Sequence, residues 1–207
     1  ITLCSMITEM AGIIGFIPEY GNKLSVEMKR YSRREFSPVR ADADAVYADS
    51  IELDVSGLPP QVAVPPSPNA VKSLADVRGI RIDSGFIGSC TNGRTEDFSI
   101  AAEILKARKV KKGVILKIVP ATRGVYEELL EGGLLEALFE SGAIVMNPGC
   151  GGCAEGHVGL TGEGEVQIST GNRNFPGKQG KGKTYLASPA VVAASCVAGA
   201  IVGPEDL

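Results

Sequence analysis

The segment AIVMNPGCGGC, Ala143 to Cys153, joins a short apolar run to a glycine-rich loop that contains two cysteines. A second segment, GFIGSCTNGRT from Gly85 to Thr95, repeats this order of an apolar run followed by a cysteine loop. Short apolar runs bounded by turn residues are typical of buried strands. Each cysteine loop is therefore expected to follow directly on a strand.

The sequence around these two segments alternates between strand and helix patterns. Strands are expected within 80–90, 113–121, 143–148 and 165–170, and helices within 95–110, 125–142 and 188–201. Thr95 is the expected N-cap of the first helix, and the Ser188-Pro189 pair is typical of a helix start. This order predicts an α/β fold with a mostly parallel sheet and helices on its faces.

A proline-rich stretch predicts a domain boundary before this pattern. Gly57 to Leu74 contains five prolines, which fix φ and remove hydrogen-bond donors, so an extended connector is expected over 58–74. Residues 1–57 are expected to belong to a preceding α/β domain, with a helix end within 2–14 and a strand within 44–57. Residues 75–207 then form the principal domain.

Composition excludes several classes of protein. The 207-residue chain has a net charge of −3, no tryptophan, 5% aromatic residues and no long Lys/Arg run, which argues against nucleic-acid binding. No apolar run reaches membrane-spanning length, and the first residues lack the basic region of a signal peptide. We expect a cytoplasmic protein. Because the first residue is Ile1, we also expect a fragment or a processed chain.

The five cysteines divide into two kinds. An odd number in a cytoplasmic chain does not indicate disulfides, and Cys4 and Cys196 are expected to be small buried apolar side chains. Ligands of parallel sheets bind beyond the carboxyl ends of the strands, so Cys90 should approach Cys150 and Cys153. Three thiolates there suit structural zinc with His157, a redox dithiol, or an iron–sulfur cluster with one open iron.

Three motifs together resemble the aconitase superfamily. They are GSCTNGRTEDF, NPGCGGCAEGH and STGNRNFPGKQG, and they occur in the order and spacing of that family. The closing segment TYLASPAVVAASCVAGAIVGPEDL is similar to the end of the large subunits of the 3-isopropylmalate dehydratase and homoaconitase branch. The resemblance covers essentially the whole chain and implies a three-layer αβα domain that binds a [4Fe-4S] cluster.

The resemblance also implies roles for individual residues. Cys90, Cys150 and Cys153 match the cluster ligands, and Asn92 lies in the first ligand loop. Asn172 and Arg173 match a pair near cluster and substrate, where an arginine can hold a carboxylate through two hydrogen bonds.

Four further positions have expected roles or departures from the family pattern. Glu9 matches an acidic residue that contacts the hydroxyl at the iron. Lys178 stands where the family commonly has a second carboxylate-binding arginine; it keeps the charge and loses the planar fork. Ser5 stands where the family usually has an asparagine. His157 is expected to support the site without acting in the reaction.

The function implied by the resemblance is dehydration and rehydration of a hydroxy polycarboxylic acid. The leading candidate is 3-isopropylmalate dehydration in leucine biosynthesis, with homoaconitase, aconitase and dimethylmalate dehydratase as alternatives. The remaining catalytic groups are expected in an N-terminal half and in a small subunit that carries a swivelling domain, so the chain should be inactive alone. A non-catalytic zinc or structural metal module is the alternative of another class. An RNA-binding relative is the third.

Overall fold

The computed structural model describes residues 2–17, 29, 32 and 39–207, without the side chains of Glu9 and Met10. The chain divides into two compact units, one formed by Ile1 and Leu3–Leu58 and the other by Thr2 and Pro59–Leu207. In the first unit, the described residues contain the helix α1 (Thr2–Met6) and the 3-10 turn η1 (Ile7–Met10). The three-part division at 57 and 74 remains a prediction.

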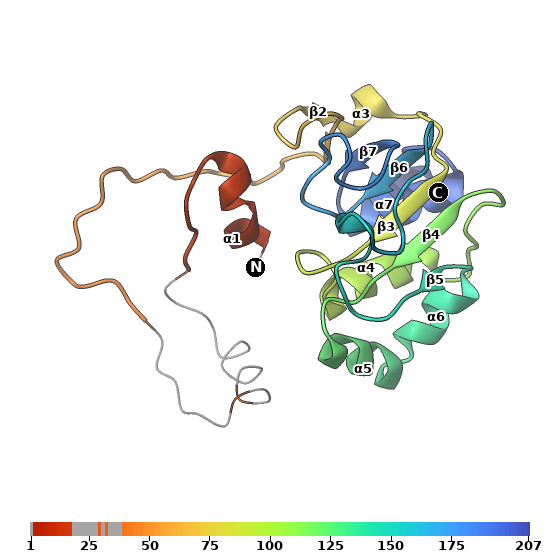
Figure 1. Cartoon of the computed structure of the whole chain (residues 1–207), viewed down its shortest axis with the longest axis horizontal. Coiled ribbons are helices and arrows are strands. Elements are labelled where there is room, and N and C mark those ends of the chain that lie inside the picture. The colour runs from red at the N-terminus through yellow and green to blue at the C-terminus, as the bar shows by residue number, and fades with distance from the viewer. Residues whose placement is uncertain (1, 18–28, 30–31, 33–38) are drawn as a thin grey trace. The chain divides into compact units, whose positions relative to one another are not determined.

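The second unit is built on one sheet whose strand order is β2-β1-β7-β6-β3-β4-β5 (Figure 1). The strands β3 (Ser84–Ile87), β4 (Ile115–Ile118), β5 (Ile144–Val145), β6 (Val166–Ser169) and β7 (Lys183–Leu186) run parallel. The strands β1 (Gln61–Ala63) and β2 (Val71–Ser73) add an antiparallel edge. The predicted α/β class with a mostly parallel sheet is confirmed.

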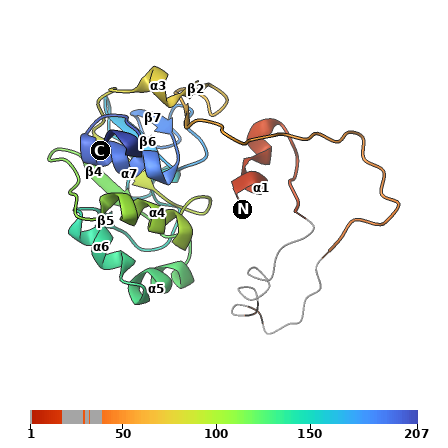
Figure 2. The same cartoon turned by 180° about the vertical axis from the view of Figure 1, so that it is seen from behind.

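Helices cover one face of this sheet. They are α4 (Thr95–Leu105), α5 (Arg123–Glu131), α6 (Leu134–Glu140) and α7 (Pro189–Ala198). Viewed from behind, α4 and α7 lie side by side against the sheet (Figure 2). Their buried residues Phe98, Leu105 and Val192 join one core with Ile87 and other strand residues. Burying each such side chain stabilises the fold by about 1.5–3 kcal/mol.

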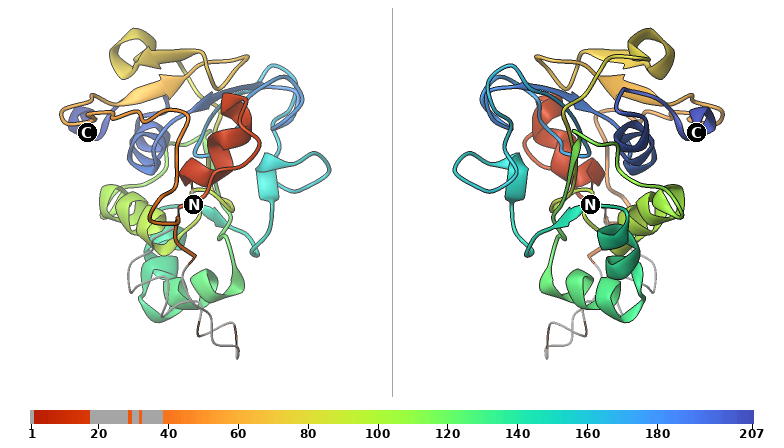
Figure 3. Two further views of the ribbon diagram at one scale, coloured as in Figure 1. Left: turned by 90° about the vertical axis from the view of Figure 1, so that its left-hand side faces the viewer. Right: turned by 90° about the vertical axis from the view of Figure 1, so that its right-hand side faces the viewer.

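Loops cover the opposite face, as the side views show (Figure 3). A Cβ on Gly152 would lie 3.2 Å from Phe86 Cδ2, and one on Gly159 would lie 3.5 Å from Lys117 Cδ. A Cβ on Gly85 would instead meet Cys196 of α7, because neighbouring residues of a strand face opposite sides. The long connection after β5 therefore lies on the face away from α7.

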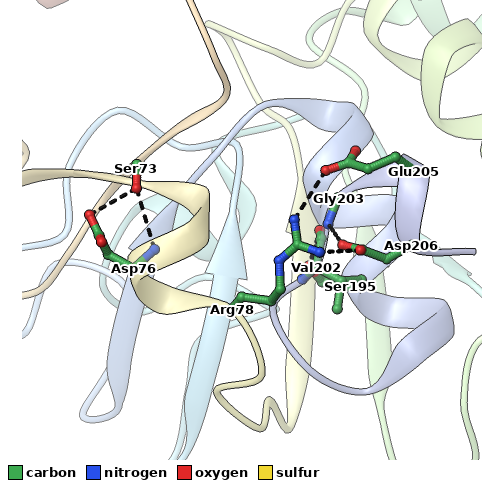
Figure 4. Close-up of polar contacts among 8 residues, drawn as sticks. All are labelled: Ser73, Asp76, Arg78, Ser195, Val202, Gly203, Glu205 and Asp206. Carbon is green, nitrogen blue, oxygen red and sulfur yellow. Dashed lines mark hydrogen bonds and ion pairs between the residues drawn. The ribbon is translucent and has the colours of Figure 1, made fainter.

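Helix ends follow the expected chemistry in part. Ser188 caps α7 by accepting from the Val191 N–H, as predicted, and Ser73 caps the short helix α3 (Leu74–Val77) in the same way (Figure 4). The prediction that Thr95 caps α4 is wrong, because Arg94 has the extended backbone of the N-cap and Thr95 is already helical. The helix also ends at Leu105, earlier than expected.

Other differences concern strands. The strand expected within 44–57 is absent, and these residues are exposed and without strand pairing. Apolar alternation alone does not hold a strand that lacks a partner. Where an extended connector was expected over 58–74, the structure has β1, β2 and the start of α3. In the described part of the chain, no helix is long and apolar enough to cross a membrane.

Candidate metal centre at the strand ends

The cysteine loops follow the carboxyl ends of parallel strands. Cys90 lies in the loop after β3, and Cys150 and Cys153 lie in the loop after β5. The loop after β6 carries Asn172 and Arg173, both half-buried. Because these three strands are parallel members of one sheet, their loops open on the same rim.

Glycines let the second cysteine loop lie directly on the sheet. Gly151 has a φ of +54°, and a Cβ there would lie 2.6 Å from Val119 Cγ2. A Cβ on Gly152 would lie 2.6 Å from the carbonyl oxygen of Gly159. Larger residues at these two positions would push the loop off the sheet and carry Cys150 and Cys153 with it.

The surroundings of Cys153 bring the predicted ligands together. Its Sγ donates to Asn172 Oδ1 at 3.5 Å, and the side chain is 5% exposed. Burial raises the pKa of the Cys153 thiol, the Lys178 ammonium lowers that pKa, and the thiols of Cys150 and Cys90 raise it. Three thiols and one cation therefore share one electrostatic neighbourhood.

The thiols differ in access to solvent. Cys90 is exposed and Cys150 is intermediate, so the rim is open on the side of these two residues. Among the described residues, no three His, Cys, Asp or Glu side chains are grouped so that they could hold a single metal ion. Cys196 is fully buried against the sheet, as predicted, whereas Cys4 is partly exposed.

Hydrogen bonds tie the first cysteine loop to the loop after β6. The Asn92 side-chain amide donates from Nδ2 to the Thr170 carbonyl at 2.7 Å. The Thr170 hydroxyl donates to the Gly88 carbonyl and accepts from the Gly88 N–H, each at 2.9 Å. Asn92, predicted at the cofactor, thus holds the backbone of the neighbouring loop in this structure.

A buried glutamine holds the turn that follows Asn172. The Gln179 amide donates to the Arg173 carbonyl at 2.7 Å and accepts from the Ser169 hydroxyl at 2.8 Å. Gln179 is 2% exposed and adjoins Lys178 in the chain. Gln179 therefore connects the Arg173 backbone and the residue after Lys178 to Ser169 of β6.

The other predicted site residues are Glu9, Ser5 and His157. The backbone of Glu9 lies in η1 of the first unit, and its side chain lies outside the described residues. Ser5 belongs to α1 of the same unit. His157 is exposed in the loop after Cys153, where its N–H donates to the Ala154 carbonyl.

Sequence reasoning missed Thr170 and Gln179. Neither residue belongs to a metal-ligand or nucleophile pattern, and short polar runs such as "STG" indicate only a turn. It also missed Ser89, which is adjacent to Cys90 and whose buried hydroxyl has no hydrogen-bond partner among the described residues. Their roles depend on strand order, which local patterns do not encode.

The fold and the rim define an α/β protein with a thiol-bearing ligand site at the carboxyl ends of its parallel strands. The chain belongs to the aconitase family: the family model described as "Aconitase family (aconitate hydratase)" matches residues 1–199. The predicted resemblance to this family is thereby confirmed.

Curated relatives narrow the comparison. The 3-isopropylmalate dehydratase large subunit 1 of Methanopyrus kandleri is 47% identical over 98% of this chain and 49% of its own length. The 3-isopropylmalate dehydratase large subunits of Nitratidesulfovibrio vulgaris and Clostridium kluyveri are 46% and 43% identical, over 100% of this chain and 49% of their own lengths. The chain thus spans about half the length of the curated relatives it matches.

Proposed function

We propose that this chain is the cluster-binding part of a hydro-lyase that isomerises a hydroxy polycarboxylic acid by removing and re-adding water. The proposed substrate is isopropylmalate, as in the names of the relatives. The observation that carries the proposal is the shared neighbourhood of Cys90, Cys150, Cys153 and Lys178 at one rim, with Asn172 in contact with Cys153.

The donor set fits a [4Fe-4S] cluster held by Cys90, Cys150 and Cys153. Thiolates are the usual protein ligands of such clusters. The thiols of Cys150 and Cys90 both raise the pKa of Cys153, so the three predicted ligands belong to one neighbourhood. Gly151 and Gly152 leave no side chain between the two cysteines of the second loop, and the Ser89 hydroxyl, without a partner among the described residues, adjoins Cys90. These observations favour a cluster over structural zinc.

With three protein ligands, such a cluster would supply one open iron as a Lewis acid for the substrate hydroxyl and carboxylate. The chain's own side chains would bind and orient the acid. Arg173 can hold one carboxylate through two parallel hydrogen bonds, and Lys178 adds a second positive charge near the thiols. Asn172 lies beside Cys153, and its side-chain amide would donate from Nδ2 to the ligating thiolate or to a cluster sulfide.

We propose that Glu9 contacts the reacting hydroxyl. Only the family resemblance supports this role. Asn92 is the proposed second support of the cluster, through its hold on the loop after β6. A small subunit is the proposed partner, because the relatives are named large subunits. The cytoplasm is the proposed location.

Anaerobic reconstitution with iron and sulfide tests the cluster. We expect about four irons per chain and, after mild oxidation, the electron paramagnetic resonance signal of a three-iron cluster that has lost its open iron. If the chain instead bound zinc tightly and formed no cluster, the catalytic proposal would be wrong and a structural metal module would be supported.

Cysteine variants test the ligands. Cys150→Ser should lose the cluster, because serine does not replace a thiolate ligand at neutral pH. Cys196→Ala is the matched control, since Cys196 lies on α7, is buried in the core against the sheet and is no predicted ligand, so its loss should leave the iron content unchanged. A brown Cys150→Ser protein with full iron content would remove Cys150 from the ligand set.

A further inference from the structure

Thr170 connects two parts of the candidate site that lie far apart in the sequence. It follows directly on β6 and is 0% exposed. Its N–H donates to the Phe86 carbonyl at 2.9 Å, and its carbonyl accepts from Asn92 Nδ2 at 2.7 Å. Its hydroxyl bonds to both backbone groups of Gly88. Every polar group of Thr170 is therefore bonded to the segment that carries Cys90.

These hydrogen bonds lie close in sequence to predicted site residues in both loops. Gly88 lies two residues before Cys90, and Thr170 lies two residues before Asn172. Asn172 in turn accepts from Cys153 at 3.5 Å. A displacement at the Thr170–Gly88 contact would thus move Cys90 relative to both Asn172 and the second cysteine loop.

We propose that Thr170 is a positioning residue, whose reciprocal hydrogen bonds with Gly88 hold the Cys90 loop in register with Asn172 and Arg173. This inference rests on the proposed function, because it assigns Thr170 the task of setting the cluster ligand against the substrate-binding pair.

The positioning depends on the Thr170 hydroxyl and not on the shape of the side chain. Thr170→Val keeps the volume and leaves the buried N–H and carbonyl of Gly88 without their partner. Thr170→Ser keeps the hydroxyl and should preserve the contact. The pair of variants therefore separates hydrogen bonding from packing.

Ser195 provides a matched control in the same unit. Its hydroxyl, on α7, accepts from the Val202 N–H at 3.1 Å and donates to the Val202 carbonyl at 3.3 Å (Figure 4). Ser195 is also 0% exposed. Ser195→Ala removes an equivalent pair of hydrogen bonds at a place that carries no predicted ligand. It therefore reports the loss of stability caused by removing such bonds alone.

Hydrogen exchange of the full metal-free chain tests the positioning directly. We expect Thr170→Val to speed amide exchange by about tenfold in residues 88–92 and 171–174 together, the size expected for a lost buried hydrogen bond. Ser195→Ala should speed exchange near 199–203 and leave those two segments unchanged. Faster exchange in only one of the two segments, or in neither, would overturn the inference.

Reconstituted protein supplies the second measurement. In the full-length large subunit with its small subunit, Thr170→Val should raise KM about tenfold with a smaller change in kcat, and should lose iron several-fold faster than the wild type. Thr170→Ser should restore both values. If Ser195→Ala raised KM as much as Thr170→Val, the effect would be general destabilisation, and the positioning role would be wrong.

The two proposals can fail separately. A wild-type chain that takes up no iron would overturn the proposed function, while coupled exchange in the two segments would still support Thr170 as the contact that holds them together. A fully active wild-type enzyme, assembled from the full-length large subunit and its small subunit, with variants at Thr170 that leave exchange and KM unchanged, would overturn only the inference about Thr170.

Discussion

Arg173 and Lys178 are the side chains on which substrate binding should depend at the scale of single residues. Arg173 follows the asparagine that contacts Cys153, and Lys178 lowers the pKa of Cys153. In the reconstituted enzyme, Arg173→Ala should reduce kcat/KM by an amount equivalent to about 2–4 kcal/mol, the cost of an unpaired carboxylate. Arg173→Lys should recover part of the loss, since it keeps the charge without the fork.

Arg123→Ala is the control for this measurement. Arg123 is 89% exposed and bonds to Glu127 on the surface of α5, so its loss should leave kcat/KM unchanged. Steady-state kinetics with isopropylmalate decide the outcome. An Arg173→Ala enzyme with wild-type kcat/KM would take Arg173 out of the substrate site.

The strand β4 contains a buried cation, which makes a prediction at the scale of one element. Lys117 is 6% exposed and donates to the Ser84 hydroxyl at 3.3 Å. Burial lowers the pKa of its amine to about 8, against partial compensation from Glu165. The folded state therefore releases this proton at lower pH than the unfolded chain, whose lysine pKa is about 10.4.

The sign of the pH effect follows from that difference. Below pH 8 both states hold the proton, and the cost of the buried charge is fully present; as pH rises through 8, stability increases. Between about pH 7.5 and 9, the free energy of unfolding of the wild type should rise by about 1 kcal/mol relative to Lys117→Met. Urea unfolding at both pH values measures it, and a constant difference would contradict the shifted pKa.

At the scale of the whole molecule, we expect the second unit to account for most of the free energy of unfolding. Among the residues that the structure describes, the members of the hydrophobic core, from Val62 to Ile201, all lie within it. Residues 59–207 should therefore unfold cooperatively, with a Tm within about 4 °C of the full chain. Phe98→Ala is the control, because an emptied core site should cost about 3–5 kcal/mol in either form. Differential scanning calorimetry of the two forms measures this. If residues 59–207 showed only a broad transition without a heat-absorption peak, the first unit would be needed for cooperative folding.

Local patterns predicted the parts of the fold that local chemistry controls. The Ser188-Pro189 start of α7 and the strands that precede the cysteine loops were predictable, because capping and apolar periodicity act over a few residues. The strand expected within 44–57 failed for the opposite reason, since a strand needs a partner. The short strand β7 was missed because its residues, KTYL, show no strong pattern by themselves.

The sequence by itself determined the chemistry of the site: three cysteines in small-residue loops, Asn172 and Arg173 in one polar turn, and membership of the aconitase family. Only the tertiary structure decided which of these groups meet. Strand β6 pairs with β3, which sets Thr170 against Gly88 across 82 residues of chain and Asn172 against Cys153. Such contacts depend on strand order in the sheet, and strand order minimises the free energy of the whole core and not of any one segment.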